Sequence, residues 1–367
     1  MQNTPLRISK IIIVCFLFSV TSLVCSYQAD SGEELSVLRD LITVAGVSMH
    51  EEPVVEKIKE LLPDNVEYQT DDMNNLLVTL GDGEPEILFI AHSDEIGLEV
   101  TGINEDGTLS TRGRGGSYST VWESKVVKIH TKNGVIDGII PPRSSYMSRT
   151  PEGHSRNDLI VDIGTQSITE TEALGIEAGD FIVQEKRMTP LANGRYTAGS
   201  IDDRAGCAAQ LIALRRLAGK NLNKTVVFAW CVEEETGLTG SGYIARTLAP
   251  KYVFPVDTFV SSDAPRDETN IGYAPLGNGA VLRVFDSSNI TPRDAFLKVR
   301  DLAQSRNIPV QWGITSGGND GSRFLSAGSI DFPLSWPGIY SHSYVSVIDM
   351  RDFNALVDLI VAIAESL

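Results

Sequence analysis

Two segments of this sequence are almost continuously apolar, and they constrain the fold more than any other feature. They are Glu86–Ala91, which reads EILFIA, and Thr225–Val232, which reads TVVFAWCV. A strand with one face in water alternates apolar and polar residues, whereas a central strand covered by helices on both faces stays apolar throughout. The two segments therefore predict central strands of an α/β domain.

Helical and extended patterns alternate on both sides of these segments. Apolar residues recur at helical spacing in Glu33–Val44, Glu51–Leu62 and Asp203–Ala218. Such alternation predicts a doubly wound mixed sheet flanked by helices. We also expect strands at Asn75–Leu80, Thr258–Ser262 and Ala280–Phe285, a short helix near Tyr243–Leu248, and helices at Pro292–Arg306 and Phe353–Leu367.

The rhythm changes in the middle of the chain. From Thr101 to about Gly194 the sequence has short β-type runs punctuated by glycine, without long helical patterns between them. This pattern predicts a small β-rich domain inserted into the α/β domain. We place the inserted domain at 101–195 and the two parts of the α/β domain at 27–100 and 196–367.

The first 26 residues have the features of a targeting segment. Arg7 and Lys10 precede Ile11–Val24, an apolar run without charge, which is typical of a signal peptide. We therefore expect residues 1–26 to be removed and the protein to be exported, either periplasmic or secreted. A form anchored to the membrane stays open, because the run is only slightly shorter than a membrane span.

Composition excludes one class of partner and one kind of framework. The net charge of −17 argues against a nucleic-acid partner, because phosphates are bound by clustered Lys and Arg. After the predicted signal peptide only Cys207 and Cys231 remain, which is too few for a disulfide framework. Both cysteines lie in apolar surroundings, so we expect buried free thiols.

Acidic and imidazole side chains gather where predicted strands end or helices begin. That is where α/β proteins place their sites. A pair of metal ions that activates water needs imidazole and carboxylate ligands and one carboxylate shared between the ions. The residues concerned are His92 and Asp94, Asp202, Glu234 and Glu235, Asp263, and His342.

This set supplies a complete ligand arrangement for two metals. One metal would take His92 and Asp263, the other would take Glu235 and His342, and Asp202 would bridge them. Asp94 then accepts a hydrogen bond from the second nitrogen of His92 and fixes its tautomer. Glu234, adjacent to a ligand but pointing to another side, would act as general base.

Each of these side chains has an ordinary explanation when it is considered alone. A single histidine in an apolar setting is usually a core or surface residue, and adjacent acids such as Asp202–Asp203 are favoured at a helix start by the dipole. The metal hypothesis therefore depends on their joint order: His-x-Asp after a strand, Asp-Asp opening a helix, Glu-Glu after a strand and a late His.

The same motifs resemble those of a known family. In order, AHSDEIG, IDDRAG, VEEETGLTG, DTFVSSDAP and YSHSYVSVIDMRD are similar to segments of the tetrahedral (TET-type) metallo-aminopeptidases, metallopeptidase family forty-two, which includes glutamyl and deblocking aminopeptidases. The resemblance covers nearly all of the chain after the predicted signal peptide. It implies a fold of the dinuclear zinc exopeptidase type, and it implies that the inserted β-rich domain serves in oligomerisation.

The resemblance also implies roles for single residues. Gly317–Asp320 is similar to the family's glycine-rich substrate loop, although a turn alone explains its composition. The resemblance implies two divalent metal ions per subunit, zinc in the first place, with cobalt or manganese as alternatives. Its metal ligands fall on His92, Asp202, Glu235, Asp263 and His342, its catalytic glutamate on Glu234, and its supporting aspartate on Asp94.

We therefore expect a dinuclear metal-dependent aminopeptidase that cleaves the N-terminal bond of peptides with a free N-terminus. A hydroxide shared by the metals would attack, with Glu234 as general base. We also expect a homo-oligomer, a dimer or higher. The alternative is an amidohydrolase acting on N-acylated amino acids or peptides. A glycoside hydrolase, which needs no His92 or His342, and a non-catalytic binding protein are further alternatives.

Overall fold

The structure is a computed structural model that describes residues 32–148, 156–265, 267 and 272–367. The predicted signal peptide, residues 1–26, lies outside these residues. Within them, no helix is both long enough and apolar enough to cross a membrane.

The larger lobe is built on a mixed sheet, as the sequence predicted. Its strand order in the described residues is β1-β2-β12-β3-β13-β17-β14-β15, with β16 beside β13. Strand β3 runs parallel to β12 and β13, whereas β2 is antiparallel to β12. The strands are β1 Tyr68–Thr70, β2 Leu76–Leu80, β3 Pro85–His92, β12 Thr225–Cys231, β13 Tyr252–Val260, β14 Ala280–Phe285, β15 Val310–Ile314, β16 Ile330–Asp331 and β17 Leu334–Gly338.

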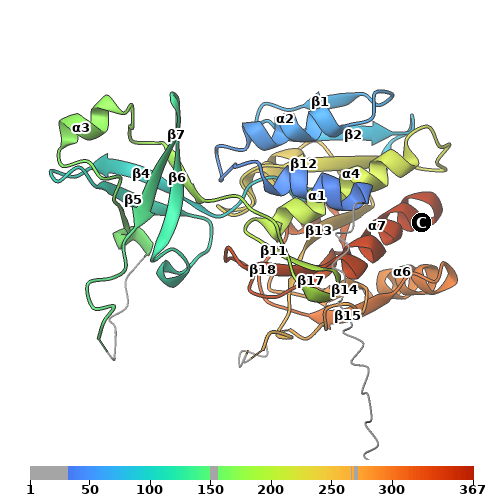
Figure 1. The fold of residues 1–367 in the computed structure, drawn as a ribbon. Coiled ribbons are helices and arrows are strands. Elements are labelled where there is room, and N and C mark those ends of the chain that lie inside the picture. The colour runs from blue at the N-terminus through green and yellow to red at the C-terminus, as the bar shows by residue number, and fades with distance from the viewer. Residues whose placement is uncertain (1–31, 149–155, 266, 268–271) are drawn as a thin grey trace, which may run out of the picture.

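Alternate residues of the central strands are buried on opposite faces of the large sheet. Ile87 and Phe89 join the core formed with α1, α4 and α7, while Leu88 and Ile90 join the core on the other face with α5 and η4 (Figure 1). The continuous apolar runs arise because both faces are covered. The helices of this lobe are α1 Glu33–Ile42, α2 Glu52–Leu61, α4 Ile201–Leu217, α5 Thr239–Ile244, α6 Arg293–Ser305, α7 Met350–Ser366 and the 3-10 helix η4 Asp320–Ala327.

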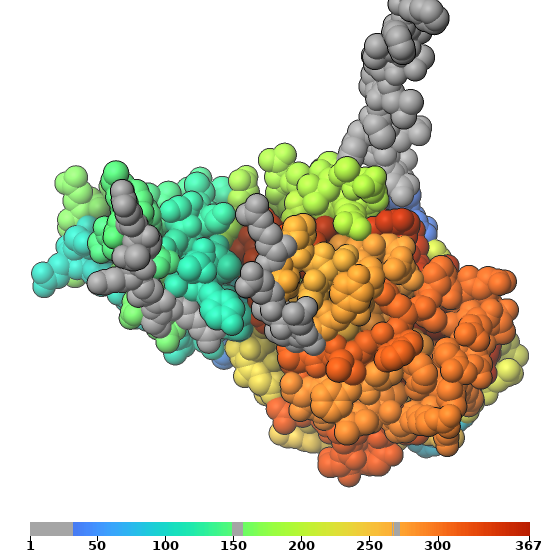
Figure 2. Space-filling model, turned by 90° about the horizontal axis from the view of Figure 1, so that it is seen from below, coloured from blue at the N-terminus to red at the C-terminus, as the bar shows by residue number. Residues whose placement is uncertain are grey.

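The inserted segment forms a second lobe with its own sheet and core. Trp122, Val127 and Ile129 are fully buried there, in an apolar cluster separate from those of the larger lobe. The two lobes lie side by side in the space-filling view (Figure 2). Along the sheet the strands are β7 Gly134–Ile140, β6 Lys125–Thr131, β9 Phe181–Gln184, β4 Gly97–Ile103, β5 Leu109–Arg114 and β8 Ile160–Val161; the short helices are η1 Ser119–Val121, η2 Arg156–Asp158 and α3 Ile168–Ala173.

The strands of this small sheet begin and end earlier than the predicted boundaries of 101–195. The first begins at Gly97 and the last ends at Gln184. The chain then returns to the larger lobe, where β10 and β11 form a three-stranded sheet with β18. These elements are β10 Thr189–Pro190, the 3-10 helix η3 Ala192–Gly194, β11 Arg195–Ala198 and β18 Ser346–Asp349.

Strand β13 differs most from its predicted position. It covers Tyr252–Val260, not Thr258–Ser262. Pro255 is a residue that disfavours a central strand, and here it is the last residue of β13 that pairs with β3. Its partner is Ile90, so Asp257 lies two residues beyond this pair, as His92 does in β3.

Candidate metal centre

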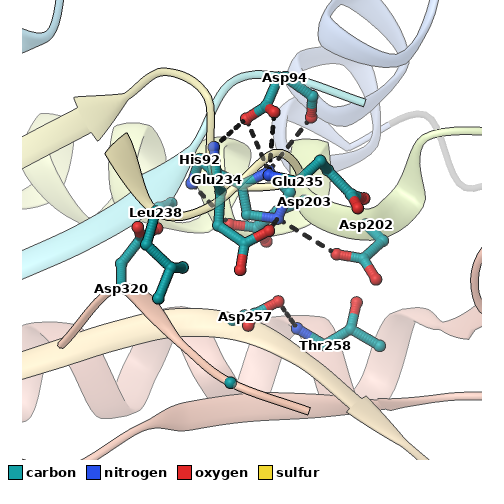
Figure 3. Close-up of polar contacts among 12 residues, drawn as sticks. His92, Asp94, Asp202, Asp203, Glu234, Glu235, Leu238, Asp257, Thr258 and Asp320 are labelled. Carbon is teal, nitrogen blue, oxygen red and sulfur yellow. Dashed lines mark hydrogen bonds and ion pairs between the residues drawn. The ribbon is translucent and has the colours of Figure 1, made fainter. Parts of the chain in front are cut away.

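The fold brings the predicted site residues to one edge of the larger sheet. His92 ends β3, Glu234 and Glu235 follow β12, and Asp202 lies in the first turn of α4, while His342 lies in the loop between β17 and β18. Because β3, β12 and β13 are parallel, their carboxyl ends meet at this edge. Figure 3 shows side chains from β3, β13, α4 and the segment after β12 facing a common space.

The carboxylate of Asp202 lies between the two imidazoles. Its Oδ1 is 3.4 Å from Nε2 of His92, and its Oδ2 is 3.6 Å from Nε2 of His342. Two ligand atoms that are each about 2.1 Å from a tetrahedral zinc ion are about 3.4 Å apart. The spacing therefore fits a carboxylate that binds one cation through each oxygen, as the sequence predicted for Asp202.

The two glutamates after β12 take different positions, although they are adjacent. Glu235 Oε1 is 3.4 Å from Nε2 of His342, a separation that also fits two ligands of one ion. Glu234 Oε2 is 3.9 Å from Nε2 of His92, and Glu234 lines the cavity at the centre of the site. This arrangement supports the predicted division between a ligand, Glu235, and a base, Glu234.

Asp94 connects the first imidazole to the segment that carries the glutamates. Its Oδ1 is 3.3 Å from Nδ1 of His92, and it accepts hydrogen bonds from the backbone N–H groups of Glu234 and Glu235, both at 3.1 Å. The hydroxyl of Ser48 donates a further hydrogen bond at 2.6 Å. Asp94 thus holds His92 with Nε2 directed at Asp202, the positioning role that we predicted.

Asp203 holds the strand end that carries His92. Its Oδ2 accepts a hydrogen bond from the backbone N–H of His92 at 3.0 Å, and its Oδ1 accepts one from Gly206 at 3.0 Å. A Cβ at position 206 would lie 2.2 Å from Oδ1, so glycine is required for this contact. The two adjacent aspartates therefore have different roles. Asp202 faces the cavity, and Asp203 holds the backbone of His92 and Gly206.

Buried charges fix the loop after β3. Arg204, fully buried in α4, donates to the carbonyl oxygens of Ser93 and Gly46 at 2.9 and 3.1 Å. Glu95 lies between Arg204 and the ammonium group of Lys186. Burial lowers the pKa of Lys186 to about 8. These contacts tie the loop that follows His92 both to α4 and to the chain returning from the small lobe.

Asp257, which the sequence analysis did not select, takes the place in the site that we predicted for Asp263. Ligand-type atoms of His92, Asp203 and Asp257 all lie within 4.8 Å of one another. Asp257 lines the central cavity and Asp263 is not among its lining residues; Oδ2 of Asp263 instead accepts a hydrogen bond from the backbone N–H of Leu276 at 3.1 Å. The geometry therefore favours Asp257 as the ligand. The sequence analysis missed it because β13 was predicted to begin at Thr258, whereas it begins at Tyr252 and includes Asp257.

Arg283 is a further residue of the site that the sequence analysis missed. Its buried guanidinium lies 3.6 Å from Asp257 Oδ2 and 2.9 Å from Asp286 Oδ2, and it donates to the carbonyl oxygen of Gly318 at 3.1 Å. It therefore joins the glycine-rich loop to Asp257. One signal was present in the sequence: a single arginine inside the apolar segment Ala280–Phe285 requires buried partners.

A cavity of about 130 Å³ occupies the centre of these groups. Gly317 and Gly318 form part of its wall, so the predicted glycine-rich loop does border the site. Asp320, at the start of η4, is buried and accepts a hydrogen bond from the thiol of Cys231 at 3.1 Å. The cavity is lined by His92, Asp202, Glu234, Asp257, Thr258, Val260, Arg283, Ser316, Gly317, Gly318 and His342.

The other cysteines and histidines that the structure describes do not line this cavity. Cys207 and Cys231 are buried free thiols, as predicted. His50 and His130 both pack against the ring of Phe181, at 4.7 and 4.5 Å between ring centroids. They are therefore half-buried packing residues and not simply surface residues. His154 lies outside the described residues.

Several buried carboxylates lie close to one another and to two imidazoles in this site, and their pKa values are shifted. Burial raises the pKa of Glu235 and of Asp257 to about 7, and burial with the neighbouring acids raises the pKa of Glu234 well above its usual value. Burial opposes charge on His92, yet Glu234, Asp202 and Asp94 raise its pKa well above the ordinary range. Divalent cations would relieve this repulsion, so the donor set fits a metal centre.

An α/β sheet with imidazole and carboxylate donors at its carboxyl edge is suited to a metal-dependent hydrolase. The sequence profile of the M42 glutamyl aminopeptidase family matches residues 74–359. The chain belongs to this family of metal-dependent aminopeptidases, and it is a peptide-bond hydrolase.

Relatives match along nearly the whole chain. The glutamyl aminopeptidase of Lactococcus lactis is 28% identical over 90% of this chain and 95% of its own length. The lysyl aminopeptidase of Pyrococcus furiosus is 27% identical over 90% of this chain and 96% of its own. The solved TET1 peptidase of Pyrococcus horikoshii, which assembles into a tetrahedron or an octahedral shell, is 35% identical with a TM-score of 0.85, covering 91% of this chain and 100% of that one.

Proposed function

We propose that this protein binds two divalent metal ions and removes residues from the free N-terminus of peptides. The observation that carries the proposal is the Asp202 carboxylate, whose two oxygens face two different imidazole nitrogens at 3.4 and 3.6 Å. A carboxylate placed in this way is suited to two cations, and a pair of cations is a recurrent device of aminopeptidases.

The chain's own residues divide into two half-sites. His92 and Asp257 would hold the first ion, Glu235 and His342 would hold the second, and Asp202 would be shared. When bound, such ions supply Lewis acidity and make water acidic enough to react at neutral pH. Zinc suits these nitrogen and oxygen donors, and cobalt or manganese suits them as well.

Glu234 lies where it can transfer a proton from the attacking water to the leaving amine. Its carboxylate faces the cavity beside His92, and burial raises its pKa well above the ordinary value. A carboxylate with a raised pKa accepts a proton from water and returns it to the leaving amine more readily than an exposed one. We assign Glu234 both steps, with Asp94 and the backbone of Glu234 holding it in place.

The anionic wall of the cavity favours a substrate with a positive N-terminus. Asp202, Glu234 and Asp257 line the central cavity of about 130 Å³, and their carboxylates attract a positively charged ammonium group. An N-acylated substrate would bring a larger and neutral group to the same place. This difference favours the aminopeptidase over the amidohydrolase of N-acylated amino acids.

A paired panel of substrates tests the proposal. Aminoacyl anilides and their N-acetylated counterparts would be offered to the purified protein, first with chelator and then with added Zn²⁺ or Co²⁺. We expect metal-dependent cleavage of the free-amino member of each pair only. Cleavage of the acetylated members alone would establish the amidohydrolase, and inactivity with metal bound would remove the enzymatic proposal.

Two further properties belong to this proposal. We propose export through a signal peptide at residues 1–26, with a periplasmic or secreted product, on the basis of the charged start and the apolar run at Ile11–Val24. We also propose a homo-oligomer, because the similar Pyrococcus horikoshii peptidase assembles into closed shells. Light scattering of the purified protein and N-terminal sequencing of the exported product test these two points.

A further inference from the structure

The ligand His342 lies on a loop without regular structure. The loop connects β17, which ends at Gly338, with β18, which begins at Ser346. Both Tyr340 and His342 have positive φ angles, of 59° and 56°, which are unfavourable for residues with side chains. A loop of this kind needs outside contacts to present an imidazole in one orientation.

One of these contacts comes from the small lobe. Nδ1 of His342 is hydrogen-bonded to the carbonyl oxygen of Gly116, which follows β5 of the small sheet. A carbonyl oxygen only accepts, so Nδ1 carries a proton, and Nε2, which faces Asp202 and Glu235, is the nitrogen that would bind a metal. The backbone of the small lobe therefore fixes the tautomer of this ligand.

The same turn approaches the second ligand of this half-site. The backbone N–H of Gly116 points at Glu235 Oε2 at 3.5 Å. At Gly115, where φ is +74°, a Cβ would lie 3.0 Å from Glu235 Oε2 and 2.8 Å from Ile96 Cγ2. Only glycine allows the backbone to come this close to Glu235.

Tyr344 anchors the His342 loop in the core of the small lobe. Its ring packs edge-on against Trp122, with 5.1 Å between the centroids, and it joins the apolar cluster of that lobe. On its other side the backbone of Gly199 lies so close that a Cβ there would be 2.5 Å from Tyr344 Cδ1. Tyr344 is thus held between the two lobes, two residues after His342.

Trp122 connects the two contacts. Its ring supports Tyr344, and its indole N–H donates a hydrogen bond to the hydroxyl of Ser117 at 3.0 Å. Ser117 follows Gly116 directly, and Trp122 is fully buried. One side chain of the small lobe therefore supports both the turn that bonds His342 and the loop that carries it.

We infer that the inserted lobe completes the second metal half-site by positioning His342 through Gly116, Trp122 and Tyr344. The first half-site, His92 with Asp257, lies on β3 and β13 of the larger lobe and does not depend on these contacts. The inference rests on the proposed function, since it requires that His342 and Glu235 bind a metal. Metal ligands whose second nitrogen loses its partner typically lose about 10–100-fold in affinity.

The test compares metal binding in matched variants of the full chain. Tyr344→Ala removes the anchor, Tyr344→Phe keeps the ring, and Ile129→Ala weakens the core of the small lobe at a fully buried position in β6 without removing a side chain that contacts the turn or the His342 loop in the hydrogen bonds and ring contacts described above. Zinc per protomer would be measured by mass spectrometry after gel filtration, and the affinity of each site by titration calorimetry.

We expect Tyr344→Ala to retain one zinc ion with the parent's affinity and to bind the second at least about 10-fold more weakly. Tyr344→Phe should match the parent, and Ile129→Ala should lose thermal stability but keep both ions. Equal metal binding in Tyr344→Ala and the parent would overturn the inference and leave the proposed function standing. A parent that binds no second ion would overturn both.

A milder variant covers the case in which Tyr344→Ala does not fold. Ser117→Ala removes the hydrogen bond from Trp122 to the turn and leaves both rings in place. We expect weaker binding of the second zinc ion, with the first unchanged. Unchanged binding of both ions in Ser117→Ala, or equal weakening of both sites, would contradict a positioning role for this turn.

Discussion

Glu234 has a position and an environment that differ from those of its neighbours. It faces the cavity 3.9 Å from His92, whereas Glu235 faces His342, and burial among other carboxylates raises its pKa well above the usual value. The adjacent Glu233 has its backbone N–H bonded to Glu51 and does not line the cavity. Three consecutive glutamates therefore have three different surroundings.

Glu234→Gln should strongly reduce turnover without removing metal. Glutamine keeps the shape of the side chain but cannot accept a proton, so we expect kcat to fall by about 10²–10⁴-fold. Metal content, measured by mass spectrometry, should equal that of the parent. Glu233→Gln is the matched control and should stay active; loss of metal in Glu234→Gln would show that this residue is a ligand.

Separate substitutions of Asp257 and Asp263 show which of the two residues is the metal ligand. We expect Asp257→Ala to lose one metal ion and to reduce kcat/KM by at least about 100-fold, because a direct ligand is worth more than a supporting residue. Asp263→Asn keeps an oxygen that can accept from Leu276 N–H, so it should bind both metals and cost about 1 kcal/mol or less in stability. The reverse pattern in metal content would restore Asp263 as the ligand.

The sequence analysis selected most of the residues that gather at this candidate site, because they follow strands that are easy to recognise. His92, Glu234 and Glu235 come directly after continuous apolar runs, and Asp202 lies at the start of a helix. Asp257 was missed because it lies inside a strand that contains Pro255. Arg283 was missed because its partners, Asp286 and the Gly318 carbonyl, become neighbours only in the folded chain.

At the scale of elements, the start of α7 contains a carboxylate that does not belong to the metal centre. Asp352 lies in the first turn of this helix and accepts hydrogen bonds from the backbone N–H groups of Gly277 and Gly279, at 2.7 and 2.6 Å. Burial raises the pKa of Asp352 to about 7. Folding therefore retains a proton on this group that the unfolded chain releases near pH 4.

This raised pKa predicts how stability changes with pH. The protonated form stabilises the fold below about pH 4, and the contribution is lost as pH rises to about 7. Asp352→Asn cannot ionise, so its stability relative to the parent should rise by about 1–3 kcal/mol between pH 4.5 and 7.5. Urea unfolding at both pH values measures this difference, and a difference independent of pH would contradict the raised pKa.

Elements with strong periodicity were predicted within a few residues, and short ones were not. The helix expected at Phe353–Leu367 is α7, Met350–Ser366, and the strand expected at Ala280–Phe285 has those bounds. The short helix expected near Tyr243 begins earlier, at Thr239. A helix of six residues has too few turns for a pattern, and its position depends on packing against η4.

For the whole molecule, the metal centre joins segments that are distant in the sequence. His92, Asp202 and His342 come from three separate parts of the chain, so bound metal should stabilise the folded state as a whole. At free zinc 100 times Kd we expect about 2.7 kcal/mol per site. Calorimetry with chelator and with zinc should show a higher Tm with zinc, and Asp202→Ala should lose most of that shift.

The two lobes explain why domain boundaries were harder to predict than elements. The small sheet begins at Gly97, only two residues after Glu95, and a glycine-punctuated pattern does not mark where one lobe ends. Two contacts join the lobes near the same site. Gly116 of the small lobe is hydrogen-bonded to His342, and Tyr344 packs against Trp122 of the small lobe. The lobes are therefore separate in their cores and joined at the proposed second half-site.

The most direct test of the account is anomalous X-ray diffraction at the zinc edge from crystals of the protein grown with zinc. We predict two peaks, one on each side of the Asp202 carboxylate, the first beside His92 and Asp257 and the second beside Glu235 and His342. A single peak, or a peak beside Asp263, would contradict the two-metal centre proposed here.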